Sequence, residues 1–247
     1  MNYMKPTIPK RASVLLLISA LLTGISASAA TIYDNSTNDR NLRFGPTTQF
    51  GDEIVLGGPS TARFLTNFSF EFWALNNGTL DPSGFSPAAS ARIRFYLNDG
   101  AVGQPTFSGY ATPGTVFYDS GFFNLGAPTD RSTFNFTAGV DFPVGGLFMP
   151  VVSNMTWTVQ FAGLDINDTA GLDVYSPPAV GSSLPDYWEF SGASWALKTN
   201  SLGGVPVNMS FAAKFDATVP EPSTVVFGVM GGLGLLVFGR RFTKASR

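Results

Sequence analysis

The sequence predicts an all-β protein, an antiparallel β-sandwich of jelly-roll-like type, over residues 31–218. Apolar and polar residues alternate along several segments, as in strands with one buried face. Turn-forming stretches such as "NNG", "NDG", "TPG" and "SPP" separate these segments. The 27 glycines and 17 prolines are spread along the chain, which favours many short strands joined by loops.

The first alternating segment, "RFLTNFSFEFWAL", mixes phenylalanines with polar residues. It predicts a strand with its polar side chains and Trp73 on the outward face, and Phe64, Phe68, Phe70 and Phe72 toward the core. Three later segments repeat the scheme around residues 91–98, 155–161 and 208–216. Their expected core residues are Ala91, Ile93, Phe95 and Leu97; Met155, Trp157, Val159 and Phe161; and Met209, Phe211 and Phe215.

Composition excludes several kinds of chemistry. The chain has no cysteine and no histidine, so it can form no disulfide, Ser-His-Asp triad, Cys-His pair or zinc site with imidazole or thiolate ligands. Carboxylate chemistry, Ser-Lys chemistry and oxygen-ligated calcium remain possible. We expect no enzymatic activity, no cofactor and no metal site.

Basic residues are concentrated at the two ends of the chain. Seven of the 15 lie there, which leaves 8 basic and 16 acidic residues between them, a net charge of −8 for the central region. Nucleic acid is therefore not an expected partner, because binding to phosphates requires a basic surface.

Residues 1–30 have the pattern of a secretory signal peptide. A basic start with Lys5, Lys10 and Arg11 runs into an apolar stretch that ends near Leu22, and the small residues "ISASAA" follow. This order is typical of signal peptides, and it predicts cleavage after Ala29 or Ala30. Export through the general secretion machinery is the expected result.

The other end, residues 219–247, predicts a single membrane-spanning helix. Residues 224–239 carry no charge and would reach about 24 Å as a helix, at the short end for a span. The basic residues behind them favour a cytoplasmic tail, with the domain on the other side of the membrane. They are Arg240, Arg241, Lys244 and Arg247.

The segment before that helix contains Val219, Pro220, Glu221 and Pro222. Prolines on both sides of a glutamate disfavour a helix interior or a central strand, so this segment is expected to be extended and accessible. The motif, apolar helix and basic end together resemble the PEP-CTERM sorting signal of exopolysaccharide-producing Gram-negative bacteria. That resemblance implies processing by exosortase, a membrane-embedded enzyme, near the motif.

The resemblance implies a protein held in the inner membrane before processing and found afterwards in the cell envelope, at the surface or in the extracellular matrix. The stretch "GLDVYSPPAVGSSLPDYWEFSGASWAL" also resembles, loosely, the late part of β-sandwich domains in exported proteins with this signal. Neither likeness assigns an activity to the domain.

A carbohydrate-binding module for extracellular polysaccharide is the first alternative function. Sugar rings stack on exposed tryptophan and tyrosine side chains. The candidate residues are Trp73, Tyr187, Trp188 and Trp195.

A glycosidase is the second alternative, since glycoside hydrolysis needs two nearby carboxylates. Glu53, Glu71 and Glu189 are the glutamates of the central region, and none lies in a recognisable motif. "LDINDTAGLD" offers oxygen ligands for calcium but lacks the order of a calcium loop, so we expect its Asp and Asn side chains to cap backbone amides instead. Seven N-x-S/T tripeptides are expected to be chance products of polar strand faces.

Overall fold

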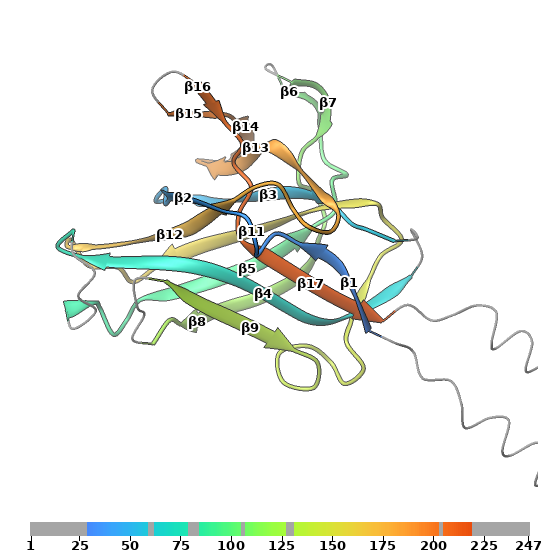
Figure 1. The fold of residues 1–247 in the computed structure, drawn as a ribbon, viewed down its shortest axis with the longest axis horizontal. Helices are drawn as coiled ribbons and strands as arrows, with labels where there is room; N and C mark the ends of the chain where they lie inside the picture. The colour runs from blue at the N-terminus through green and yellow to red at the C-terminus, as the bar shows by residue number, and fades with distance from the viewer. Residues whose placement is uncertain are drawn as a thin grey trace, which may run out of the picture. The chain divides into compact units, whose positions relative to one another are not determined.

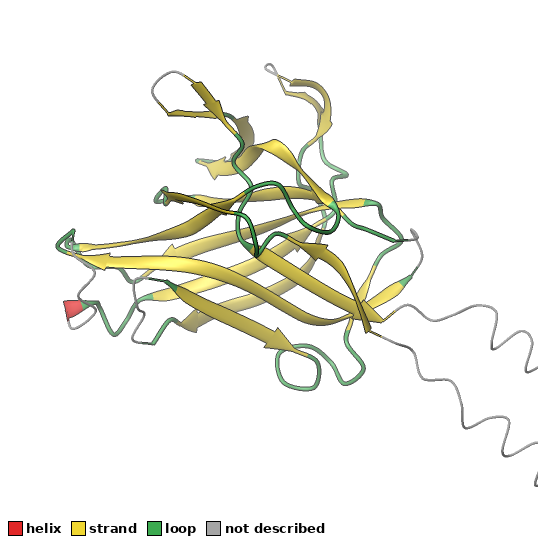
Figure 2. Ribbon diagram, viewed as in Figure 1, coloured by secondary structure: helices red, strands yellow, loops and turns green. Residues whose placement is uncertain are grey.

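The computed structural model describes residues 29–58, 62–78, 84–104, 107–126, 131–202 and 205–218. Within these residues nearly all regular structure is β-strand (Figure 2). Two antiparallel sheets pack face to face, which confirms the predicted sandwich.

The first sheet has seven strands and is built around the long strand β4 (Figure 1). The neighbours β9 and β10 pair with one side of β4, while β17 and β12 pair with successive parts of the other side. The strands are β1 (Ala29–Asp34), β17 (Ala213–Thr218), β4 (Arg63–Asn76), β12 (Asp168–Tyr175), β2 (Asp39–Phe44), β9 (Ser132–Thr137) and β10 (Leu147–Met149).

The second sheet has six strands, and two short hairpins extend from its side of the molecule (Figure 1). In order across the sheet they are β14 (Ser194–Lys198), β13 (Ser182–Ser191), β3 (Gln49–Val55), β11 (Asn154–Ala162), β5 (Ser90–Tyr96) and β8 (Val116–Asn124). The hairpins are β6 (Val102–Gln104) with β7 (Phe107–Ala111), and β15 (Asn200–Leu202) with β16 (Val205–Val207).

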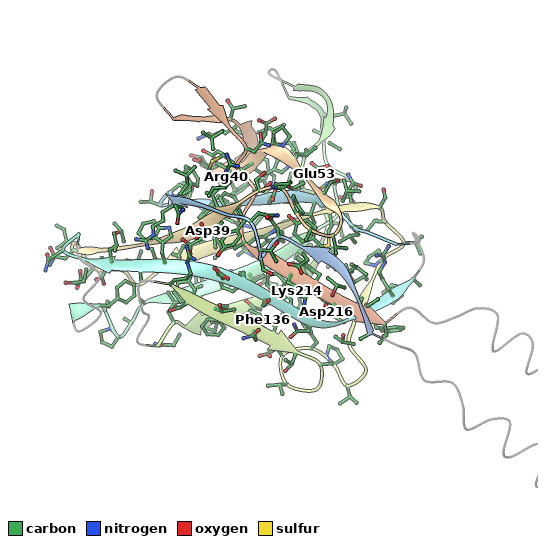
Figure 3. All side chains as sticks on the ribbon, viewed as in Figure 1. Asp39, Arg40, Glu53, Phe136, Lys214 and Asp216 are labelled. Atoms are coloured by element: carbon green, nitrogen blue, oxygen red, sulfur yellow. The ribbon has the colours of Figure 1, made fainter. Side chains whose placement is uncertain are left out.

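Aromatic rings from both sheets fill the space between them. Phe68 of the first sheet packs edge-to-face against Phe95 and Trp157 of the second, with ring centroids 5.0 and 5.6 Å apart. Figure 3 shows the density of side chains between the layers. Each such pair adds about 0.5–1.5 kcal/mol to the free energy gained by burying the rings.

Most of the predicted core residues are buried. Phe161 is half-buried against the core, Leu97 is half-buried just after the end of β5, and β4 departs from the predicted alternation. Phe68, Phe70 and Phe72 face the core, but at the start of the strand Leu65 is buried and Phe64 is not. The cause is a β-bulge: Asp216 pairs with Asn67 and Ala217 pairs with Leu65, so one extra residue on β4 reverses the alternation. The prediction for Phe64 was therefore wrong.

Strand β11 is buried on both faces rather than on one. Met155, Trp157 and Val159 face the core as predicted, and Thr156 and Thr158 on the opposite face are also fully buried. Strand β17 is shorter than predicted, because it begins at Ala213 and leaves Met209 and Phe211 in the preceding segment, where both are buried.

The first and last described strands lie next to each other. Strand β1 pairs antiparallel with β17, and Ala29 is opposite Thr218. Strand β1 therefore starts two residues before the predicted domain boundary at residue 31. The chain enters and leaves the sandwich at the same end, as Figure 1 shows for β1 and β17.

Candidate functional site

The four aromatic residues proposed for sugar binding do not form one surface. Trp73 belongs to the first sheet, whereas Tyr187, Trp188 and Trp195 belong to the β13–β14 pair of the second. Tyr187 faces the core, and its pKa is raised to about 12 by burial and by the nearby Glu189.

Trp73 lies on the outward face of β4, as predicted, but its side chain is only 8% exposed. It is opposite Gly171 of β12, and it packs so close to Gly45 that a Cβ there would lie 3.0 Å from the indole. The missing side chain at Gly45 leaves room for the ring. No broad ring face of Trp73 is open to a sugar.

Trp188 is fully buried, although it points away from the core. Its Nε1 donates a hydrogen bond of 3.1 Å to Oε2 of Glu53, and Asn154 donates one of 2.8 Å to Oε1 of the same carboxylate. Trp195 is half-buried between Tyr96 and Phe190, with ring centroids 5.3 and 5.1 Å away. These rings have structural partners.

A polar network covers the outward face of the second sheet. Gln49 donates hydrogen bonds of 2.8 Å to the hydroxyls of Tyr96 and Thr158 and accepts one from Arg94. Arg94 also pairs with Asp119 at 3.1 Å. A hydrogen bond from Arg92 is the main reason that the pKa of Asp119 lies well below its usual range. The network explains how Thr158 can be buried on an outward face.

The three glutamates of the glycosidase hypothesis lie on three different strands, and each has a structural contact. Glu53 accepts the hydrogen bonds from Trp188 and Asn154, and Glu189 pairs with Lys198 at 2.8 Å. Glu71 accepts a hydrogen bond of 2.8 Å from the hydroxyl of Tyr175. Figure 3 labels Glu53 in the second sheet, whereas Glu71 lies on β4 of the first.

In the stretch "LDINDTAGLD", residues 164–173, aspartate side chains cap backbone N–H groups. Oδ1 of Asp165 accepts from the N–H of Asn167, and Oδ2 of Asp168 accepts from the N–H groups of Asp165 and Ser86. Asn76 donates to Oδ1 of Asp168. The predicted capping role is confirmed. Among the described residues no group of three or more acidic side chains could hold a metal ion.

A charged cluster lies on the outward face of the first sheet, where β2, β4 and β12 meet. Arg131 pairs with Asp39 at 2.7 Å, with Asp173 at 3.6 Å and with Glu71 at 3.8 Å. Arg43 pairs with Asp173 at 3.8 Å. Burial raises the pKa of Asp173 to about 6, although the two arginines oppose this shift.

A shallow open hollow of about 220 Å³ lies beside this cluster. The side-chain hydroxyls of Ser69 and Thr133 make no hydrogen bond with any described residue. No described residue donates a hydrogen bond to Oε1 of Glu71. Within the described ranges, the hollow therefore offers two hydroxyls and one carboxylate oxygen without a hydrogen-bond partner. Its lining residues are Ser36, Ser69, Phe70, Glu71, Thr133, Ala212 and Ala213.

Sequence reasoning missed this hollow. The alternating polar residues of "NFSFEF" and "STFNFT" place Ser69 and Thr133 on outward strand faces, and that signal is visible in the sequence. The pairing of β4 with β9, which brings Ser69 opposite Asn135 and Glu71 opposite Thr133, is not.

The predicted terminal signals lie outside the described residues, apart from Ala29 and Ala30. These are the signal peptide, the sorting motif at Val219, Pro220, Glu221 and Pro222, the helix 224–239 and the basic tail. Within the part of the chain that the structure describes, no helix is long and apolar enough to cross a membrane.

Comparisons with family models, curated proteins and solved structures find no match to this chain. The two-sheet fold is therefore known from the structure alone.

Proposed function

We propose that this chain is an exported, non-catalytic protein of the cell envelope or extracellular matrix. Its jelly-roll-like sandwich would be held at the inner membrane by the C-terminal helix until exosortase processes the chain near Pro220-Glu221-Pro222. The partners in this proposal are the general secretion machinery, exosortase and the membrane.

The observation that carries the proposal is the pairing of β1 with β17. Ala29 and Thr218 are opposite each other, so a signal peptide before β1 and an anchor after β17 would both leave the same end of the sandwich. A domain built in this way can be attached to one membrane through either end without disturbing its sheets. The structural contacts of Glu53, Glu71 and Glu189 further support a non-catalytic domain.

We expect the native cell to cleave the chain at two places to give the mature protein. Cleavage after Ala29 or Ala30 would remove only the first residues of β1 and keep Thr31, whose hydroxyl donates a 2.7 Å hydrogen bond to Asp216. The second cut should fall near Glu221 and release the apolar helix. Mass determination of both mature termini tests this, and a chain that keeps residues 1–30 and 224–247 would contradict the proposal.

Polysaccharide binding is a second candidate function. The hollow beside Glu71 is a better candidate site for it than the buried tryptophans. Free hydroxyl and carboxylate oxygens match the hydrogen-bonding groups of a sugar. The hollow is smaller than the roughly 300–1,000 Å³ of typical ligand pockets, so it would take a single sugar unit.

If the hollow binds sugar, replacing Thr133 by valine should weaken binding roughly tenfold, which corresponds to about 1.4 kcal/mol. The variant keeps the shape of the strand and removes one hydroxyl. Thr137→Val, on the same face of β9 but outside the hollow, is the matched control. A glycan array probed with the full chain would measure the effect, and the absence of any bound glycan would remove this candidate.

A further inference from the structure

Exposed apolar side chains gather at the end of the sandwich where the chain enters and leaves. We call this end the terminal pole; it comprises the starts of β1 and β4, the end of β17, the loop 138–146, and strand β10 with the two residues that follow it, Pro150 and Val151. On β4, Phe64 is opposite both Thr218 of β17 and Phe148 of β10. The last described residue of the chain therefore lies beside these strands.

Four of the nine exposed large apolar residues in the described part of the chain belong to this pole. Single exposed apolar residues are normal on protein surfaces, whereas a group of them at one place calls for a partner. The four are Val140 (82% exposed), Val144 (93%), Phe148 (52%) and Val151 (62%).

The loop 138–146 presents its two valines in a fixed conformation. The N–H of Ala138 donates to the carbonyl of Thr66, and the N–H of Gly139 donates to that of Phe142. The side chain of Phe142 is buried in the core. Because the phenylalanine anchors the loop from inside, Val140 and Val144 on either side of it remain exposed.

The loop is also held directly against β4. The backbone of Gly146, at a φ of +105°, lies so close to this strand that a Cβ would be 2.7 Å from the carbonyl oxygen of Leu65. Phe148, just beyond, packs edge-to-face against Phe64 with ring centroids 5.7 Å apart. The apolar surface is therefore a rigid part of the sandwich.

We propose that the terminal pole rests on the lipid bilayer and inserts Val140, Val144, Phe148 and Val151 into its interface. The inference rests on the proposed function, because it takes residues 224–239 as the membrane anchor. Thr218 and Thr224 are six residues apart in the sequence, and six extended residues span at most about 20 Å. An anchored chain would thus keep this end of the sandwich close to the bilayer.

The charge pattern favours insertion of apolar side chains over electrostatic attraction. Asp141 is the only charged residue in the loop 138–146, and its carboxylate accepts a hydrogen bond of 2.9 Å from the N–H of Thr137. Basic clusters that attract anionic lipid lose their effect in salt. The proposed contact should therefore form on neutral phosphatidylcholine and persist at high ionic strength.

The absence of cysteine makes a direct test possible, since any introduced cysteine is a unique labelling site. Val144→Cys probes the pole. Ile166→Cys is the matched control, because Ile166 is 98% exposed and lies in the loop before Asp168, which is opposite Asn76 at the far end of β4. Twelve residues of strand separate Phe64 from Asn76, or about 40 Å.

The full chain, labelled with an environment-sensitive fluorophore, is reconstituted into phosphatidylcholine vesicles with and without nitroxide-labelled lipid. We expect at least about twofold stronger lipid quenching at residue 144 than at residue 166, unchanged in about 0.5 M salt. Equal and weak quenching at both sites in vesicle-bound protein would overturn the lipid contact alone.

Two other results would also contradict the inference. Shielding of residue 144 from an aqueous quencher without lipid quenching would mean that protein covers the pole, either a second copy or the chain's own tail. Failure of the full chain to float with the vesicles would overturn the membrane anchor itself, and the lipid contact with it.

Discussion

The wild-type chain is expected to lose folding stability as the pH rises above about 4, and replacing Asp52 by asparagine is expected to abolish this pH dependence. Asp52 lies on β3 and is opposite Trp157 of β11, on the core side of the second sheet. It is fully buried, and neither carboxylate oxygen has a well-formed hydrogen bond in the described residues. An ionised carboxylate is very unfavourable in such surroundings.

The sign of the effect follows from the direction of the pKa shift. Burial raises the pKa of Asp52 well above its usual range, the charge of Glu53 adds to the shift, and the backbone N–H of Phe211 opposes it. Between the pKa of the unfolded chain, about 3.9, and that of the folded chain, the folded state binds more protons. Stability is therefore fully present at low pH and falls as the pH rises through this window, by at most about 1.4 kcal/mol per pH unit.

Urea unfolding of the full chain between pH 3 and pH 8, followed by tryptophan fluorescence, would measure the effect. The useful quantity is the difference between wild type and Asp52→Asn, because other titrating groups such as Asp119 and Asp173 cancel in it. We expect the asparagine variant to gain in relative stability with increasing pH above about 4. If this difference in the free energy of unfolding is constant over the whole pH range, ionisation of Asp52 does not destabilise the folded chain.

The strand pattern was predictable because it depends on local alternation, and its errors come from pairing. Phe68, Phe70 and Phe72 were correctly assigned to the core from their spacing. Phe64 was not, because the bulge on β4 arises from its register with β17, about 150 residues later in the chain. An extra residue in one strand leaves no mark in the sequence of that strand alone.

The candidate aromatic site illustrates a second limit of sequence reasoning. The outward direction of Trp73 follows from alternation, but its burial depends on Gly45, which belongs to another part of the chain and leaves space for the indole. Similarly, the burial of Trp188 goes with a hydrogen bond to Glu53, 135 residues away in sequence. Direction can be predicted from one strand, whereas exposure depends on its neighbours.

The second large effect is expected at the sorting motif, outside the sandwich. Replacing Glu221 or Pro220 by alanine should leave export intact but retain the protein in the inner membrane, because exosortase would no longer process it. The basic tail would keep the unprocessed chain in place: moving an arginine or lysine through the bilayer centre costs about 2.5–3.5 kcal/mol each on insertion scales. If residues 224–239 span the membrane as proposed, Arg240, Arg241, Lys244 and Arg247 together would make release without cleavage very unfavourable.

Cell fractionation, combined with the mass of the C-terminus, distinguishes sorting from simple anchoring. Ser223→Ala, next to the motif, is the matched control and should behave as wild type. Deletion of residues 240–247 should instead disturb retention and topology before processing, because it would remove the positive charge expected to orient the predicted helix. If the Glu221→Ala chain reaches the surface or medium as efficiently as wild type, with the same C-terminal mass, residues 219–247 act only as a membrane anchor. The pairing of β1 with β17 would be the same in either case, since it depends on the strands of the sandwich and not on the residues after Thr218.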